Sequence, residues 1–84
     1  MSKHEKLLEK LLATPTPAQF KWNDLVSVLS HLGYRQLNNS GSRRKFHNAE
    51  KDLLIICHEP HPRSDVDKGC ISDVVEHLKS NGLI

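Results

Sequence analysis

Apolar residues recur along this chain with the period of helices toward both ends and the period of strands in between. The first helical pattern spans Ser2–Ala13, where leucines form one stripe and charged residues cover the other side. Pro15 and Pro17 favour extended backbone, so this helix must end before them. The pattern leaves open whether the helix packs on the rest of the chain or on a partner. The leucine stripe consists of Leu7, Leu8, Leu11 and Leu12.

A second helix is predicted to begin after Asn23, a suitable N-cap residue, and to end at Gly33, a suitable C′ residue. Trp22, just before the predicted cap, should fold back on this helix, and nothing requires it to stack on a ligand. The apolar positions recur with helical spacing and predict a buried face made of Leu25, Val28, Leu29 and Leu32.

Three strands are predicted next, separated by clusters of turn-forming residues. Tyr34–Leu37 is short, and Ser42–His47 alternates so that Phe46 should face the core. Leu53–His58 is a continuous apolar run, which is typical of a central strand or of one covered on both faces. The side chains predicted to face outward from the middle strand are those of Arg43, Lys45 and His47.

The last helix is predicted to begin after the N-cap Asp67 and to close at Gly82, with Leu83 available for a Schellman ending. Its apolar stripe is Ile71, Val74, Val75 and Leu78. The order of elements predicts an α+β fold: a dsRBD-like α-β-β-β-α two-layer sandwich, with helices on one face of a three-stranded antiparallel sheet, plus an extra N-terminal helix. The predicted division is residues 1–19, an N-terminal helix and proline-containing linker, and residues 20–84, the compact domain.

Composition narrows the class of protein without naming a function. The 84 residues are 37% hydrophobic and 26% charged, as in a globular domain, and the formal charge of +2 permits a polyanionic partner without requiring one. Cys57 and Cys70 are far apart in the sequence and form no CxxC motif, which favours reduced thiols in the cytoplasm. No signal-peptide pattern and no membrane-length apolar run occurs, so we expect a cytoplasmic protein without a membrane partner.

Three short motifs resemble one family. They are Gly41-Ser42 before a basic strand that ends in Phe46, His61-Pro62, and Lys68-Gly69-Cys70-Ile71 at the start of the last helix. In this order they are similar to the HicA toxins, small mRNA interferases of bacterial and archaeal toxin–antitoxin pairs. The likeness covers roughly Trp22–Ile84.

The resemblance implies a dsRBD-like fold, cleavage of mRNA as an endoribonuclease, and a HicB-type antitoxin that masks the sheet. In the family, the catalytic histidine typically stands directly after Gly-Ser or one residue later. Arg43 and Arg44 occupy these positions here, so the chain resembles a subgroup written GSR. No residue at these positions can take over the role of the catalytic histidine.

Arginine can replace the phosphate contact of a histidine but not its proton transfer, because the guanidinium stays protonated. RNA cleavage through the 2′-hydroxyl also needs proton carriers, a role that suits histidine because its pKa lies near neutrality. His47 stands about 13 Å along the strand from Arg43, too far to occupy the same atomic position. The candidate catalytic residues are His47, His58 and His61.

The basic residues have two interpretations. They form either a phosphate-binding surface or a solvated strand face whose charges prevent edge pairing, and the family resemblance favours the first. The candidate RNA-binding residues are Arg43, Arg44, Lys45, Arg63 and Lys68.

The run from Cys57 to His61 contains metal-ligand types, but closed zinc sites draw on two spaced ligand pairs, so we expect neither a metal nor another cofactor. Three functions remain open: an RNA-binding toxin that cleaves mRNA, a non-catalytic RNA- or protein-binding module of the same fold, and a protein-interaction domain that uses the first helix.

Overall fold

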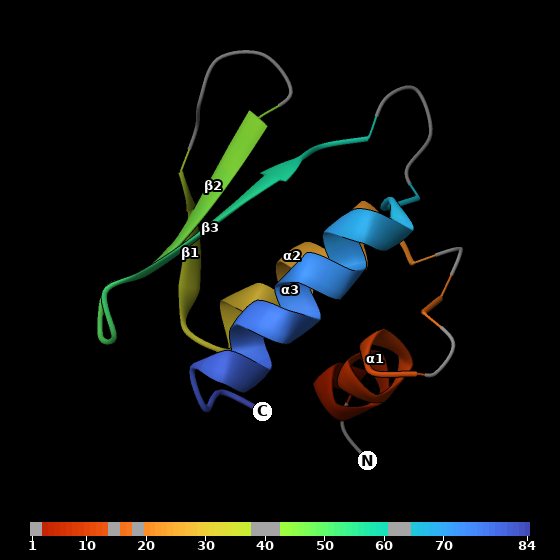
Figure 1. The fold of residues 1–84 in the computed structure, drawn as a ribbon, viewed down its shortest axis with the longest axis horizontal. Coiled ribbons are helices and arrows are strands. Elements are labelled where there is room, and N and C mark those ends of the chain that lie inside the picture. Colours follow the sequence, from red (N-terminus) through yellow and green to blue (C-terminus); the bar gives the residue numbers. More distant parts are fainter. Residues whose placement is uncertain (1–2, 14–15, 18–19, 38–42, 61–64) are drawn as a thin grey trace.

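The computed structural model describes residues 3–13, 16–17, 20–37, 43–60 and 65–84. The strands form an antiparallel sheet in the order β1-β2-β3, and α2 and α3 lie on one side of it (Figure 1). This confirms the predicted α+β architecture with an extra N-terminal helix. The elements are α1 (Lys3–Leu11), α2 (Trp22–His31), β1 (Tyr34–Leu37), β2 (Arg43–Asn48), β3 (Leu53–His58) and α3 (Lys68–Ser80).

The core lies between the sheet and the helices α2 and α3. The stripes predicted for both helices are buried there, with Leu32 and Val75 packed at the margin of the core. Phe46 extends from the middle strand into this core, where its ring lies 5.7 Å from that of Trp22. Each fully buried aliphatic or aromatic side chain contributes about 1.5–3 kcal/mol, so these residues dominate the stability of the fold.

Helix α1 packs against α2, away from the sheet (Figure 1). Leu11 is only 1% exposed, and Leu7 and Leu8 pack against the same core. The apolar stripe of the first helix is therefore used within the chain. This settles the question that the leucine pattern left open, and it leaves little of that stripe for a partner.

The beginning of α2 differs from the prediction. The helix starts at Trp22, and its N-cap is Lys21, whose side chain makes no capping hydrogen bond, so the assignment of Asn23 as N-cap was wrong. Trp22 is the first helical residue and is buried, because its ring packs in the core against the ring of Phe46. The segment before α2 is held from outside the helix: the Val66 N–H donates to the Phe20 carbonyl at 2.7 Å.

The remaining helix ends follow the prediction. Gly33 follows α2 with φ +99°, a left-handed conformation that glycine adopts without a Cβ penalty. Asp67 caps α3 by accepting the Gly69 N–H at 2.9 Å. At its other end, Leu83 N–H donates to the Leu78 carbonyl and Gly82 N–H to the Lys79 carbonyl, which is the predicted Schellman ending.

The third strand is not central. β2 pairs with both neighbours, whereas β3 pairs only with β2 among the described residues, so the prediction of a central or doubly covered strand was wrong. Ile55 and Cys57 face the core, while Leu54 and Ile56 are 48% and 50% exposed. A continuous apolar run therefore marks a strand with one face in the core and an apolar, uncovered outer face. β2 also runs to Asn48, one residue beyond the predicted end.

Candidate nucleic-acid interface

The face of the sheet that points away from the helices carries the chain's candidate chemistry. Strand alternation places the core residue Phe46 on one face of β2 and its neighbours Lys45 and His47 on the other. We call this outer surface the open face. By alternation and strand register it consists of Arg35, Leu37, Arg43, Lys45, His47, Leu54, Ile56 and His58.

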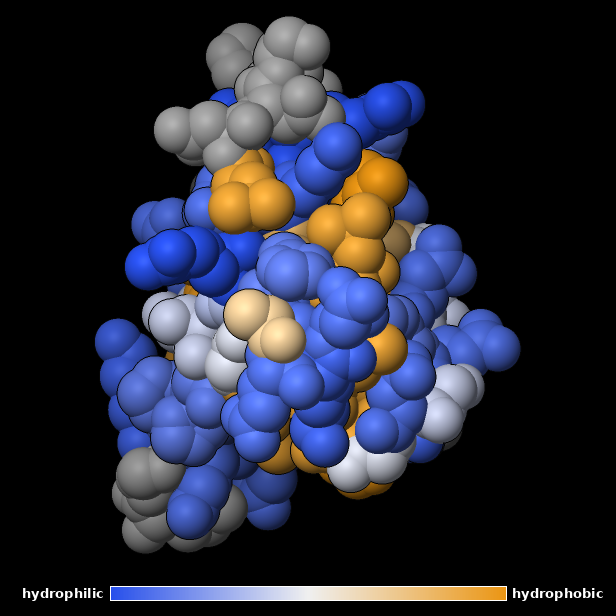
Figure 2. Space-filling view, turned by 90° about the vertical axis from the view of Figure 1, so that its left-hand side faces the viewer, coloured by the Kyte–Doolittle hydropathy of each residue, from blue (hydrophilic) through white to orange (hydrophobic). Residues whose placement is uncertain are grey.

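Strand register decides which of these side chains are neighbours. Arg43 stands opposite His58, and directly opposed residues have Cβ atoms about 4.5–5.5 Å apart. Lys45 stands between Leu37 and Ile56 in the next row. The open face therefore mixes cationic, imidazole and apolar groups. Figure 2, drawn from the side of the molecule on which the strands lie, shows hydrophobic patches set among hydrophilic surface.

The cations of the open face are not neutralised by the part of the chain that the structure describes. Arg43 is exposed, Lys45 is half-buried, and neither forms an ion pair with a described carboxylate. Neither lies under a helix, because both helices of the domain cover the opposite face. These are the conditions under which a phosphate could contact both groups.

Arg44 lies differently from its neighbours. It shares the inner side of β2 with Phe46, and its Nε lies 3.3 Å from Oε1 of Glu59. Its guanidinium also donates to the Arg43 carbonyl at 3.1 Å. The three consecutive basic residues of the sequence are thus divided between two faces, and only Arg43 and Lys45 belong to the open face.

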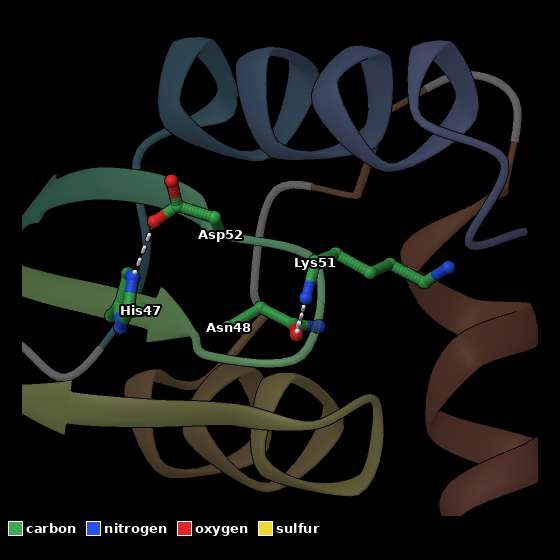
Figure 3. A network of polar contacts seen from close by, with 4 residues as sticks. All are labelled: His47, Asn48, Lys51 and Asp52. Carbon is green, nitrogen blue, oxygen red and sulfur yellow. Dashed lines mark hydrogen bonds and ion pairs between the residues drawn. The ribbon is translucent and has the colours of Figure 1, made fainter.

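His47 has an acidic neighbour across the β2–β3 turn. Its Nε2 lies 3.2 Å from Oδ1 of Asp52, and Figure 3 shows the two side chains pointing toward each other. Asp52 has φ +51°, which is uncommon for a residue other than glycine and reflects the tight turn. An imidazole beside a carboxylate can hold a defined tautomer. This pair is largely exposed, so its energetic contribution is small.

The histidines predicted to carry protons are separated by the fold. His58 is exposed on the open face beside Arg43, whereas His47 is four residues along β2 from that arginine. His61 and Arg63 lie outside the described residues. Lys68 is the exposed first residue of α3 and does not belong to the sheet. The register therefore brings one candidate carrier, His58, next to one candidate phosphate ligand.

Arg35 is a basic residue of the open face that was not among the predicted RNA-binding residues. It stands opposite His47 and adds a third cation to the open face. The signal was present: with Tyr34 buried, alternation along Tyr34–Leu37 places Arg35 and Leu37 outward. The strand was too short to draw attention to these two side chains.

A groove of about 510 Å³ lies between β3 and the first half of α3. Its walls include Ile56, His58, Cys57, Cys70 and Asp73. Among the described residues, no three histidine, cysteine or acidic side chains converge as metal ligands. The part of the chain that the structure describes also contains no helix long and apolar enough to cross a membrane.

One of three comparisons with known proteins identifies a family. A family model described as "HicA toxin of bacterial toxin-antitoxin" matches residues 22–83, which span the whole sheet together with α2 and α3. The chain belongs to the HicA toxin family. No curated protein and no solved structure matches it.

Membership makes this chain a toxin of a toxin–antitoxin system. The match begins at Trp22, so α1 stands outside the part shared with other HicA toxins, although it contributes Leu11 to the common core. The open face lies entirely within the matched residues. The residues shared with the family therefore include every residue of the open face and none of the first helix.

Proposed function

We propose that this HicA toxin binds RNA through the open face, cleaves mRNA there, and is silenced by a HicB-type antitoxin that covers the same face. The observation that carries the proposal is the position of Arg43, an exposed guanidinium on the middle strand with His58 directly across from it. Lys45 and Arg35 extend the positive surface along the sheet. Phosphate contacts of this kind position a nucleic acid without specifying its sequence.

The chemistry assigns different roles to the two neighbouring groups. In cleavage through the 2′-hydroxyl, His58 would take the proton from that hydroxyl. The 2′-oxygen would then attack the adjacent phosphorus. Arg43 would hold the phosphate and stabilise the negative charge of the pentacoordinate state with paired N–H donors. His61 is the first candidate for protonating the leaving oxygen. His47, paired with Asp52, stands four residues along β2 from Arg43 and could serve only a phosphate lying farther along the face.

The apolar residues of the open face support the partner in this proposal. Leu37, Leu54 and Ile56 are the large hydrophobic side chains exposed on the sheet. RNA phosphates gain nothing from aliphatic groups, whereas the core of a protein interface is apolar. A face that alternates cations with aliphatic side chains suits a nucleic acid in one state and an antitoxin in the other.

The second candidate is a toxin of the same fold that occupies RNA without cutting it. Arg43 favours this alternative, because it stands where the family resemblance places the catalytic histidine and cannot transfer a proton at neutral pH. The two candidates share the RNA-binding face and differ only in the chemical step.

An RNA cleavage assay separates them. The purified chain is incubated with a labelled single-stranded RNA in chelator, and the products are tested for 2′,3′-cyclic phosphate ends. We expect cleavage by the wild type and a loss of about 10²–10⁴-fold in the His58→Ala variant, the usual contribution of a general acid or base. His4→Ala is the matched control, since His4 lies on α1 and should be dispensable. His47→Ala and His61→Ala identify the second carrier.

Two results would count against cleavage by this site. Binding without any product in the wild type would establish the non-catalytic alternative. Cleavage that survives each of the histidine substitutions would show that other groups carry the protons.

A further inference from the structure

The two cysteines of the chain meet across the groove between β3 and α3. Cys57 lies on the core side of β3, Cys70 lies in the first turn of α3, and both line the groove. Cys70 packs against the core cluster to which Cys57 belongs, so helix and strand bring the two side chains together at the groove. A hydrogen bond between the two thiols is the largest influence on the pKa of each. Both are free thiols. Twelve residues lie between the two positions, so their spacing in the sequence does not predict that they come together.

The two thiols are not equivalent. Cys57 is 2% exposed, whereas Cys70 is partly exposed to the groove. The hydrogen bond from Cys57 lowers the pKa of Cys70, while burial and the carboxylates of Asp73 and Asp67 oppose this effect. The same hydrogen bond, together with burial, raises the pKa of Cys57. The first turn of a helix also favours a thiolate, because its free N–H groups and dipole stabilise negative charge.

We propose that Cys70 and Cys57 form a thiol-oxidation site, in which a peroxide oxidises Cys70 and Cys57 then closes a disulfide between α3 and β3. In the first step, the Cys70 thiolate attacks one peroxide oxygen, the S–O bond forms, the O–O bond breaks, and the other oxygen leaves as water after protonation. In the second step, the Cys57 sulfur attacks the sulfenic sulfur, and the oxygen leaves as water with the Cys57 proton. Two thiols and one hydrogen peroxide thus give one disulfide and two waters.

The surroundings of the pair fit this division of roles. The groove gives a small oxidant access to Cys70, the partly exposed sulfur, and leaves Cys57 behind it as the resolving thiol. Among the described residues, the other ionisable groups that line the groove are His58, Asp67, Asp73 and His77. The inference is independent of RNA binding, since both sulfurs lie on the helix side of β3 and the test contains no RNA.

The test treats the 84-residue chain with hydrogen peroxide and follows it by mass spectrometry under non-reducing conditions. We expect the monomer to lose two hydrogen masses, a single cross-linked peptide containing both cysteines, and full reversal by dithiothreitol. In Cys57→Ser, and equally in Cys57→Ala, Cys70 should stop at the sulfenic acid and react with dimedone. In Cys70→Ser, Cys57 should resist oxidation because it is buried. Circular dichroism checks that each variant is folded.

Alkylation rates test the assigned nucleophile. In the wild type, the thiol that reacts first should be alkylated by iodoacetamide at neutral pH about tenfold faster than Cys70 is in the Cys57→Ala variant. The variant is slower because it lacks the hydrogen bond that stabilises the Cys70 thiolate. Asp73→Asn should speed the reaction about two- to fivefold by removing an opposing charge at the groove. Glu76→Gln makes the same charge change at an exposed position of α3 that does not line the groove, and it should not.

The proposal is overturned if peroxide yields only intermolecular disulfides, if both thiols stay reduced in the folded protein, or if dimedone labels Cys57 in preference to Cys70. Equal effects of Asp73→Asn and Glu76→Gln would remove the electrostatic part of the assignment and with it the choice of Cys70 as nucleophile.

Discussion

The buried side chain of Asn48 should contribute strongly to the stability of the fold. Its side chain is 2% exposed, and its Nδ2 donates to the Leu32 carbonyl at 3.3 Å, at the end of α2. Its Oδ1 accepts the Lys51 N–H at 3.0 Å, within the β2–β3 turn (Figure 3). One amide therefore ties the second helix to the hairpin that carries the open face. It also fills the space beside Gly33, where an added Cβ would lie 3.3 Å from Nδ2.

The Asn48→Ala substitution removes both hydrogen bonds. Each contributes about 0.5–1.5 kcal/mol, and the Leu32 carbonyl is left partly buried without its partner, so we expect a loss of about 2–3 kcal/mol in the free energy of unfolding. That is a large fraction of the roughly 4–13 kcal/mol that a domain of this size commonly has. Urea unfolding followed by fluorescence of the single tryptophan, Trp22, measures it.

Two further substitutions make this prediction refutable. Asn48→Asp keeps the acceptor for Lys51 but brings a carboxylate close to the Leu32 carbonyl, so it should be at least as destabilising as Asn48→Ala near neutral pH. Asn81→Ala is the matched control: its Nδ2 donates to the His77 carbonyl at 2.8 Å in an exposed position, and its loss should cost less than about 1 kcal/mol. If Asn81→Ala destabilised the protein as much as Asn48→Ala, burial would not explain the effect.

Three further predictions concern stability. Leu11→Ala should cost about 2–3 kcal/mol in urea unfolding, since it empties a core position, whereas the exposed Glu9→Ala should change little; equal effects would mean that α1 does not dock in solution. Burial raises the pKa of Tyr34, so the stability contributed by its neutral phenol is fully present below pH ~10 and falls as the pH rises through the folded pKa. Tyr34→Phe should flatten this loss of stability in an alkaline pH series, and an unchanged profile would contradict the prediction. The Cys57–Cys70 disulfide should raise the unfolding free energy by about 3 kcal/mol relative to the reduced protein, and a lower value would indicate strain.

The helices and the bounds of two strands could be predicted from the sequence because their signals are local. The Schellman ending at Gly82 and the cap at Asp67 depend on residues within one helical turn, and the structure has both. The first residue of α2 could not be predicted from the neighbouring residues in the sequence. Trp22 becomes helical and buried because a residue far along the chain, Phe46, packs against it, and this outweighs the capping preference of Asn23.

The candidate site was predictable only in part: the sequence pointed to Arg43 and Lys45, but not to Arg35 or to the pairings across the sheet. Alternation along β2 correctly placed Arg43 and Lys45 away from the core residue Phe46. Only the strand register shows that His58 stands opposite Arg43. The apolar run of β3 was misassigned as a covered strand, because hydrophobicity alone does not distinguish a surface buried in the fold from one left open.

The central claim is that phosphates lie against the open face, and the salt dependence of RNA binding tests it most directly. Affinity for a single-stranded RNA is measured over a series of salt concentrations for the wild type, Arg43→Ala and Lys45→Ala, with Lys79→Ala on the exposed side of α3 as the matched control. We predict that each open-face substitution weakens binding and reduces the slope of log K against log salt by about 0.7, the value for one lost contact to a single strand. Lys79→Ala should leave the slope unchanged. Equal slopes for all four proteins, or a loss confined to Lys79→Ala, would contradict the account.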